Sequence, residues 1–557
     1  MSDNESHSSM HRVVIVGGGT AGWLAAGILA AKLSANHTVT LIESPNIPSL
    51  GVGEGSWPSL RDTLLDIGIS ETEFLTVCHG AFKQGSSFVN WRKGGHCYYH
   101  PFTVPTGYNE LDIYTCWKSI APNTSYEDVF SLQAAMCAAG KAPKQIATPD
   151  YAHVLNYGYH FDATKFAELL KNHCVDKLNV AHVVGHVDSV HSHQNGDIES
   201  VSTKDGKKIV GDLFIDCSGS SGLLIKEHFN IPWVPVKRTM LNDRAVALQV
   251  PYSNEDAEIK STTVATAQTC GWTWDIALQH RRGVGLVYSS QFTNEEQAKQ
   301  VLIDYVRERY PSAQDAELSF RTLSFEPGYR SQFWVKNCLS LGMSSGFVEP
   351  LEASAIAMVE LGLRMLCEAF PQNKAHMEIA SKRYNSRFAY RWQRVIDFLK
   401  LHYALSDREE PYWLAQRDKA SIPDSLAELL ELWKYQSPSR LDLIENEEIF
   451  PSASYQYVLY GMGFSSSTSP LRLNEEHKRK AVHIRETLQQ TKNAYLQGLP
   501  SNRVLLNDIA KRYNNEKQHV PSHAQREKNE HASASSCNDI KNTSDKKDTS
   551  YDRIGFR

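Results

Sequence analysis

The sequence predicts an α/β fold in which an N-terminal βαβ unit is enlarged by β-rich insertions and followed by a helical region. Three observations predict it. A short β-branched run at 13–16 leads into a glycine-rich turn and then a helix-forming segment. Residues 179–217 and 240–345 have the short, alternating pattern of strands, interrupted by one helix near 294–309. Residues 354–500 are mostly helix-forming.

The βαβ unit is the first element that the sequence predicts. Residues 13–16 (VVIV) form a buried parallel strand, and residues 23–29 continue as a helix. Residues 38–42 form the next strand, which ends at Glu43. This order of strand, turn, helix, strand and acid is typical of a Rossmann-like unit.

The turn after the first strand carries Gly17, Gly19 and Gly22 in the spacing G-x-G-x-x-G. The first glycine permits the tight turn, the second lets the backbone approach a pyrophosphate, and the third lets helix and strand pack closely. Free N–H groups at the helix N-terminus then face the phosphates. An acid at the end of the second strand accepts from a ribose hydroxyl. The expected cofactor-binding residues are Gly17, Gly19, Thr20, Ala21, Gly22 and Glu43.

The fingerprint alone fits FAD and NAD equally well. Its place near the N-terminus, together with a later strand and turn at 212–222, favours FAD. No second G-x-G-x-x-G follows in the chain. We therefore expect one bound dinucleotide and a separate protein as the source of electrons.

The remaining chain divides by composition and periodicity. Residues 44–150 are rich in loops, with a helix expected from Trp57, and residues 161–178 form a helix with Asp162 as its N-cap. From 514 onward the chain is polar and almost free of aliphatic residues, which predicts a disordered tail. The expected division is a cofactor-binding core at 12–350, a mainly helical substrate-binding region at 351–513 and the tail at 514–557.

Composition excludes several classes of protein. The chain has 557 residues, 58 basic and 63 acidic, for a net charge of −5, so no basic surface for nucleic acid is indicated. No run of 18 apolar residues predicts a membrane span, and the polar start of the chain does not resemble a signal peptide. Ten cysteines are scattered without a C-x-x-C, so no metal or redox motif is indicated. We expect a cytoplasmic protein.

Six further segments follow one another in an order that resembles the flavin-dependent tryptophan halogenase family over roughly residues 12–500. They are GVGEGSWP at 51–58, FKQG at 82–85, NDRA at 242–245, GWTWDI at 271–276, GFVEPLE at 346–352 and DFLKLHY at 397–403. The resemblance implies an FAD-binding Rossmann-like domain of the flavin monooxygenase (glutathione-reductase-like) type, and it adds Gly346 to the cofactor-binding residues.

The resemblance implies a two-component enzyme. A separate NAD(P)H-dependent flavin reductase supplies FADH₂, oxygen adds to give a flavin hydroperoxide, and a bound halide is oxidised to hypohalous acid. This oxidant passes through a tunnel to a lysine beside a small, electron-rich aromatic substrate, expected to be of indole type. From composition we expect no nucleic-acid partner and no membrane partner, and the oligomeric state, with a homodimer as one candidate, stays open.

The resemblance implies two catalytic residues. Lys83 matches the lysine that holds hypohalous acid or forms a haloamine, a reaction that requires an amine shielded from water. Glu352 matches the glutamate that polarises the halogen donor or takes the proton from the ring. A carboxylate near Lys83 would also keep it protonated. Glu349, three residues earlier, is expected to be structural.

Trp272 and Trp274 lie two residues apart, so a strand places them on one face. The resemblance implies that they form a wall between flavin and substrate, and core packing is compatible with that role.

The chain departs from the family at two places. Ala277 stands where the family has proline, and Ala353-Ser354-Ala355 stands where it has Ser-Thr-Gly. The halide-binding N–H groups then belong to Ser354 and Ala355. Because Ala355 restricts the backbone more than glycine does, we expect bromide to be preferred over chloride. The alternative is that the loop adjusts and chloride is used as in the family.

Two alternatives remain open from the sequence. The first is a single-component aromatic hydroxylase with the same FAD fold, although Met343 stands where such enzymes usually have Asp. The second is a non-catalytic flavin-binding relative. The presence of both Lys83 and Glu352 argues against it.

Overall fold

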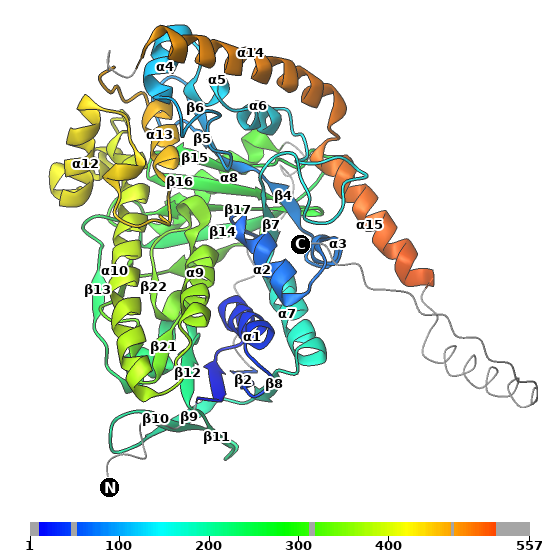
Figure 1. Ribbon diagram of the computed structural model, residues 1–557, viewed down its shortest axis with the longest axis vertical. Coiled ribbons are helices and arrows are strands. Elements are labelled where there is room, and N and C mark those ends of the chain that lie inside the picture. The colour runs from blue at the N-terminus through cyan, green and yellow to red at the C-terminus, as the bar shows by residue number, and fades with distance from the viewer. Residues whose placement is uncertain (1–9, 46–52, 311–317, 469–472, 520–557) are drawn as a thin grey trace, which may run out of the picture. The chain divides into compact units, whose positions relative to one another are not determined.

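The structure is a computed structural model, and it describes residues 10–45, 53–310, 318–468 and 473–519 (Figure 1). The predicted α/β fold is confirmed. Contacts divide the chain into two compact units, Met1–Ile509 and Ala510–Arg557. All residues of the candidate site that are discussed below belong to the first unit.

The predicted βαβ unit lies at the centre of a mainly parallel sheet. β1 pairs in parallel with β2 on one side and with β12 on the other, as buried apolar strands do. At one edge, β20 pairs antiparallel with β21. In spatial order the strands are β20 (Trp334–Val335), β21 (Cys338–Ser340), β12 (Leu213–Asp216), β1 (Arg12–Val16), β2 (Thr38–Glu43) and β8 (Ala181–Val184).

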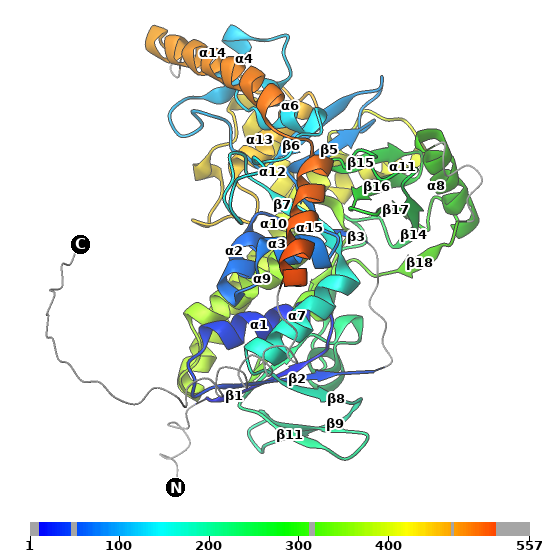
Figure 2. The ribbon, with the colours of Figure 1, turned by 90° about the vertical axis from the view of Figure 1, so that its right-hand side faces the viewer.

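Helix α1 (Thr20–Lys32) follows the glycine-rich turn and contacts α7 (Ala163–Lys177) and α9 (Ser354–Glu368) (Figure 2). It is enclosed because every residue from Gly22 to Leu29 is buried. Asp162 caps α7 as predicted, accepting from the N–H groups of Thr164 and Lys165.

A second, mostly antiparallel sheet forms the predicted β-rich region. It begins in the first hundred residues, since β5 pairs in parallel with β15. In spatial order its strands are β18 (Arg321–Ser324), β14 (Arg244–Pro251), β17 (Arg281–Tyr288), β16 (Gly271–Ala277), β15 (Thr263–Gln268), β5 (Gly85–Val89) and β6 (Cys97–Pro101).

Three small sheets complete the strands in the described residues. One of them, β3–β7–β4, brings Lys83 next to the glycine-rich segment at 53–55. This sheet consists of β3 (Gly53–Gly55), β7 (Gly158–Asp162) and β4 (Ala81–Lys83). The second sheet consists of β9 (Val187–Ser192), β10 (Ile198–Thr203) and β11 (Lys208–Val210). The third consists of β13 (Trp233–Pro235), β19 (Gly328–Arg330) and β22 (Gly346–Phe347).

The region at 44–150 is more regular than the sequence predicted. Its described residues, 44–45 and 53–150, contain four strands, β3 to β6, and five short helices: α2 (Ser59–Ile67), α3 (Glu71–Val77), α4 (Ile113–Ile120), α5 (Tyr126–Val129) and α6 (Gln133–Ala138). Each of these helices has fewer than ten residues, so its periodicity is too short to separate a helix from a loop.

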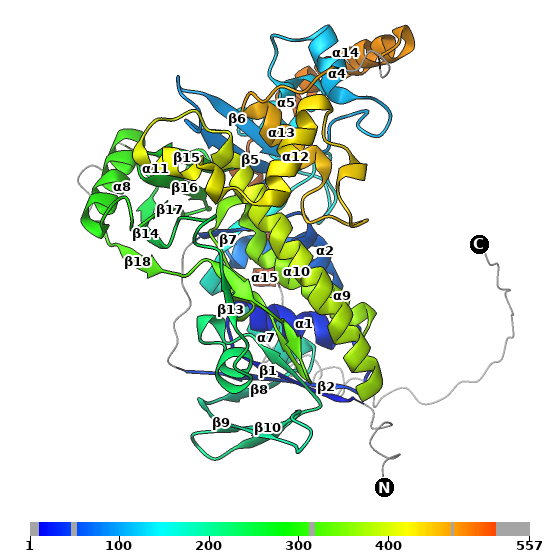
Figure 3. The same cartoon turned by 90° about the vertical axis from the view of Figure 1, so that its left-hand side faces the viewer.

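The predicted helical region is present beyond residue 351. The other α-helices of the described chain are α8 (Glu295–Arg309), α10 (Lys374–Ala404), α11 (Pro411–Gln416), α12 (Asp424–Tyr435), α13 (Ser452–Gly461), α14 (Glu475–Gly498) and α15 (Asn502–His519). The long α10 contacts α9, α11, α12 and α13 (Figure 3).

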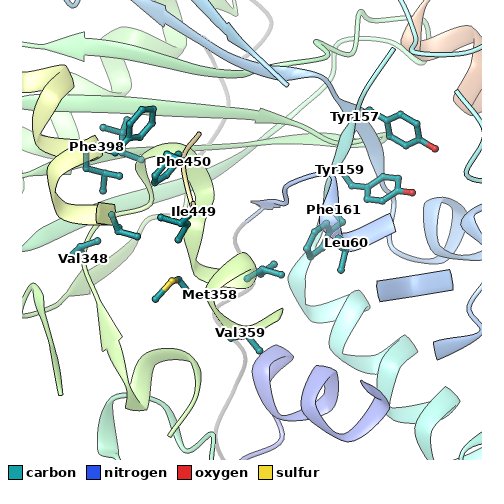
Figure 4. Packing of buried hydrophobic residues seen from close by; sticks show 14 of the residues in the cluster. Leu60, Tyr157, Tyr159, Phe161, Val348, Met358, Val359, Phe398, Ile449 and Phe450 are labelled. Atoms are coloured by element: carbon teal, nitrogen blue, oxygen red, sulfur yellow. The ribbon is translucent and has the colours of Figure 1, made fainter. Parts of the chain in front are cut away.

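A single hydrophobic cluster runs across the expected division at 350. It joins Val13 of β1, Leu363 of α9, Val395 of α10 and Leu505 of α15. Figure 4 shows a part of this cluster, in which Phe398 and Phe450 stack with their ring centroids 3.9 Å apart. The division at 350 stays a sequence-based prediction.

The start of the predicted tail needs correction, because α15 continues to His519. Lys, Arg, Glu and Gln are frequent at 511–518, and their good helix propensity continues the helix past 514. Residues 520–557 lie outside the described residues.

Within the described ranges, no helix has the length and apolar character needed to cross a bilayer. The same ranges contain no group of three or more His, Cys, Asp or Glu side chains arranged to hold a metal ion.

Candidate active site

Lys83 is the last residue of β4, and its side chain is 1% exposed. The Nζ atom lies 5.3 Å from the centroid of the Phe102 ring. A Cβ at Gly55 would come within 3.3 Å of Nζ, so the glycine leaves room for the amine. No described residue makes a hydrogen bond to Nζ. Burial lowers the pKa of Lys83 to about 8, although the charge of Glu352 acts in the opposite direction.

Glu352 lies in the turn that leads into α9, and its backbone is left-handed, with φ of 62°. The next residue, Ala353, is also left-handed, with φ of 54°. Such a conformation costs about 1–2 kcal/mol for a residue with a Cβ. The Trp57 indole N–H, which donates to the carbonyl oxygen of Glu352 at 2.7 Å, helps to hold this turn.

The Glu352 carboxylate is buried and makes contacts with three other elements. Its Oε1 lies 2.8 Å from Nδ1 of His100 and 3.2 Å from Nε2 of His402. Its Oε2 accepts from the Ser86 hydroxyl at 3.3 Å. Burial alone would raise the pKa of Glu352, but the two imidazoles, His100 first, outweigh it and hold the pKa well below its ordinary value.

A cavity of about 150 Å³ opens beside Glu352. Its wall is mainly aromatic and apolar, and it includes Phe450, which packs between Phe398 and Trp57. The lining residues are Trp57, Pro58, His100, Pro101, Phe102, Thr103, Val104, Glu352, Ile449, Phe450, Pro451, Ala453, Ser454 and Tyr457. Phe102 therefore has Lys83 next to its ring and the cavity at its surface.

Glu349 belongs to a different buried network. Its carboxylate accepts from the Asn242 amide and from the Tyr403 hydroxyl. The Asn242 carbonyl in turn accepts from the Tyr412 hydroxyl at 3.1 Å. Burial raises the pKa of Glu349. These partners agree with the structural role expected for Glu349.

Trp272 and Trp274 lie in the middle of β16 and are both buried. Their ring centroids are 6.4 Å apart in an edge-to-face arrangement, and Trp91 lies 6.3 Å from Trp272. Trp274 covers Gly285 on the neighbouring strand so closely that a Cβ there would lie 2.2 Å from its ring. The pair forms a rigid aromatic layer in the sheet, as expected from its spacing.

The expected halide-binding residues lie directly after Glu352. Ser354 is the first residue of α9, whose N-terminus has no side-chain cap. The N–H groups of its first turn have no partner within the helix, so they can bind an anion. The left-handed backbone falls at Glu352 and Ala353, whereas Ala355 is helical and exposed. The Cβ of Ala355 is therefore accommodated, and the constraint on this turn comes from Ala353.

The expected cofactor-binding residues gather at the N-terminus of α1. A Cβ at Gly17 would lie 2.2 Å from the Cys217 carbonyl oxygen, and one at Gly22 would lie 1.9 Å from the Gly17 carbonyl oxygen. A Cβ at Gly19 would meet nothing within 4 Å. Gly19 is also the N-cap of α1, without a side-chain cap, and Thr20 and Ala21 start the helix. The turn is therefore closed toward the protein and open where a phosphate would approach.

Glu43 ends β2 as predicted. Its Oε2 lies 2.8 Å from Nε2 of His182 and 3.1 Å from Nζ of Lys171. Gly346 lies in β22, where the Trp392 ring fills the place of a side chain, so packing explains this glycine. Gly342 instead lies against Ala21, since a Cβ there would come within 2.9 Å of the Ala21 Cβ.

The structure thus brings Lys83, Glu352 and Ser354 to one region, and the glycines and Glu43 to another. The sequence predicts no role for His100, His402 or Ser86. His402 lies in the segment 397–403 that carries the resemblance, which is a usable signal. His100 and Ser86 lie in short strands without a motif, and only the fold brings them to Glu352.

The comparison with known families decides the identity. A family profile described as tryptophan halogenase matches residues 12–475. The chain belongs to the tryptophan halogenase family. It is a flavin-dependent halogenase, and this assignment favours halogenation over the hydroxylase and non-catalytic alternatives.

Relatives of the tryptophan halogenase family match most of the chain. The tryptophan 6-halogenase of Streptomyces toxytricini is 34% identical, over 81% of this chain and 89% of the relative. The crystal structure of a tryptophan halogenase from Shewanella frigidimarina is 43% identical, with a TM-score of 0.88 over 91% of this chain and 99% of that one. A tryptophan C-6 flavin-dependent halogenase (chlorinase) from taromycin biosynthesis is 32% identical, with a TM-score of 0.83 over 90% and 99%.

The lowered pKa of Lys83 predicts a pH-dependent contribution to the stability of this halogenase. Between about pH 8 and the ordinary lysine value of 10.5, the unfolded chain binds a proton that the folded chain has released. The free energy of unfolding should therefore rise with pH across this window, by about 3 kcal/mol in full. Urea unfolding of wild type and Lys83→Met, followed across the window, measures the difference. Parallel pH profiles of the two proteins would contradict the buried amine.

Proposed function

We propose that this enzyme halogenates an electron-rich aromatic substrate of indole type, using FADH₂, oxygen and a halide, with Lys83 relaying hypohalous acid to the ring. One observation carries the proposal. The buried amine of Lys83, without a hydrogen bond to any described residue, lies 5.3 Å from the centroid of the Phe102 ring, and both Phe102 and Glu352 line the cavity. Family membership supports the flavin and the halide.

The glycine turn before α1 fits an FAD pyrophosphate. The open space at Gly19, the uncapped N-terminus of α1 and the position of Glu43 at the end of β2 suit the phosphates and the ribose. When bound, reduced FAD and oxygen supply the oxidant that converts halide into hypohalous acid. The chain has one G-x-G-x-x-G, so we propose that a separate NAD(P)H-dependent flavin reductase supplies the reduced flavin.

Lys83 holds the oxidant next to the substrate. With a pKa of about 8, an appreciable fraction of Lys83 is free amine near neutral pH. The ammonium form can donate a hydrogen bond to hypohalous acid, and the amine form can bind the halogen. The surrounding apolar walls exclude water, which limits loss of the oxidant. Trp272 and Trp274 form the layer that we propose separates flavin from substrate.

Glu352 serves as the base. Its lowered pKa keeps it ionised, so it can accept the proton that the ring loses after the halogen is bound. The same negative charge raises the pKa of Lys83 and stabilises its ammonium form.

The cavity wall favours recognition through the aromatic ring. Trp57, Phe102 and Phe450 offer flat apolar surfaces. The described lining residues include no Lys or Arg that would pair with a substrate carboxylate. We therefore propose that an indole-type ring, more than a charged substituent, determines binding.

The Lys83→Ala variant should lose at least a hundredfold in halogenated product and still oxidise reduced FAD with oxygen at the wild-type rate. The reason is that the lysine acts only after the oxidant has formed. The assay combines FAD, a flavin reductase, NADH and bromide or chloride with a panel of indoles, phenols and pyrroles, and detects halogen isotope patterns by mass spectrometry. Near-normal product yield would refute the relay.

The Gly19→Val variant should fold and lose FAD affinity by at least tenfold, because the new side chain occupies the space that a pyrophosphate needs. Gly22→Val is the comparison for loss of folding, since its side chain collides with the protein backbone and should lower the melting temperature. Circular dichroism and FAD titration separate the two effects. Unchanged FAD affinity in folded Gly19→Val would disprove the assignment.

Bromide should be the better halide. The N–H groups of Ser354 and Ala355 follow a turn that Ala353 constrains. An anion site that cannot contract weakens the binding of chloride more than that of bromide, because chloride is smaller and more strongly hydrated. Bromide is also easier to oxidise. Competition between equimolar chloride and bromide measures the preference, and a predominantly chlorinated product would refute it.

A further inference from the structure

The His402 ring is fixed by a partner on each nitrogen. The ring is 0% exposed. Its Nδ1 lies 2.9 Å from the carbonyl oxygen of Phe398, one turn earlier in α10, and its Nε2 lies 3.2 Å from Oε1 of Glu352.

These two partners determine where the ring protons must be. A carbonyl oxygen can only accept a hydrogen bond, so Nδ1 of His402 carries a proton. An ionised carboxylate also can only accept, so Nε2 carries a second proton whenever Glu352 is ionised. The hydrogen bonds therefore correspond to an imidazolium at His402.

The second imidazole at Glu352, that of His100, has a hydroxyl as its other partner. Nδ1 of His100 donates to Oε1 of Glu352, whereas Nε2 lies 2.9 Å from the Ser454 hydroxyl, which can donate to it. Because a hydroxyl can donate or accept, this contact does not determine the protonation of His100. The two acceptors at His402 require a proton on each of its ring nitrogens.

The surroundings of His402 suit a buried cation. The Phe88 ring lies 4.7 Å away in a tilted arrangement, and the Trp91 ring lies 5.9 Å away, edge to face. Aromatic faces attract cations, and the adjacent carboxylate compensates much of the cost of burial.

The two oxygens of Glu352 are consequently unequal. Oε1 receives both imidazoles, whereas Oε2 receives only the Ser86 hydroxyl, at 3.3 Å, among the described residues. Oε2 therefore has the lone pair that remains available.

We propose that His402 is a positioning residue for halogenation: as an imidazolium it keeps Glu352 ionised and fixes Oε1, so that Oε2 accepts the proton from the ring. In this step the ring C–H bond breaks, its electron pair restores aromaticity, and the proton passes to Oε2. The inference rests on the proposed role of Glu352.

Nitrogen-15 NMR of the full-length protein, labelled at histidine, tests the charge directly at pH 8, where an exposed histidine is neutral. His402 should show two protonated ring nitrogens. His402→Gln and His402→Phe identify its signals by their loss. One protonated and one unprotonated nitrogen at His402 would overturn the proposal.

Kinetics test the positioning role. His402→Gln should lower kcat for halogenated product at least tenfold, with KM for the aromatic substrate and the rate of reduced-flavin oxidation unchanged. A folded His402→Gln enzyme with wild-type kcat would overturn the proposal. If Glu352→Gln retains full activity, the proposed role of Glu352 fails instead, whatever the charge of His402.

Discussion

The buried Glu352 carboxylate is the interaction on which the site depends. An isolated carboxylate in an apolar interior is strongly unfavourable, so its donors must be held in place by the fold. These donors come from β5, β6 and α10, which lie far apart in the sequence. The ion therefore joins a strand pair of the seven-stranded sheet to the long helix. Displacement of any of these elements would remove one of the three donors from the buried carboxylate.

Adjacent residues of α10 bind both glutamates of the turn before α9. His402 contacts Glu352, and Tyr403 donates to Glu349. This arrangement explains why two successive residues of the turn, Glu352 and Ala353, keep a left-handed backbone without being glycine. The buried partners of the two carboxylates compensate for the strain. The same turn leaves the first N–H groups of α9 uncapped, so the strain and the anion-binding potential have a common origin.

The sequence was sufficient for the βαβ unit, because strand, glycines, helix and acid are local signals. The helical C-terminal region was also predictable from its periodicity. The short helices α2–α6 were not, since fewer than ten residues carry too little pattern. In the site, Lys83 and Glu352 were found through family resemblance alone. His100 could not be found, because its role depends on the pairing of β5 with β6 and on the return of the chain at 352.

The contact between Trp274 and Gly285 makes these two positions dependent on each other during evolution. While the tryptophan is present, residue 285 has no space for any side chain. If the tryptophan is replaced first by a small residue, space for a side chain opens on the neighbouring strand. The order of substitutions therefore decides which defect the intermediate carries: a path that begins at 285 meets a steric clash with the ring, whereas a path that begins at 274 leaves a cavity that a side chain at 285 can then fill.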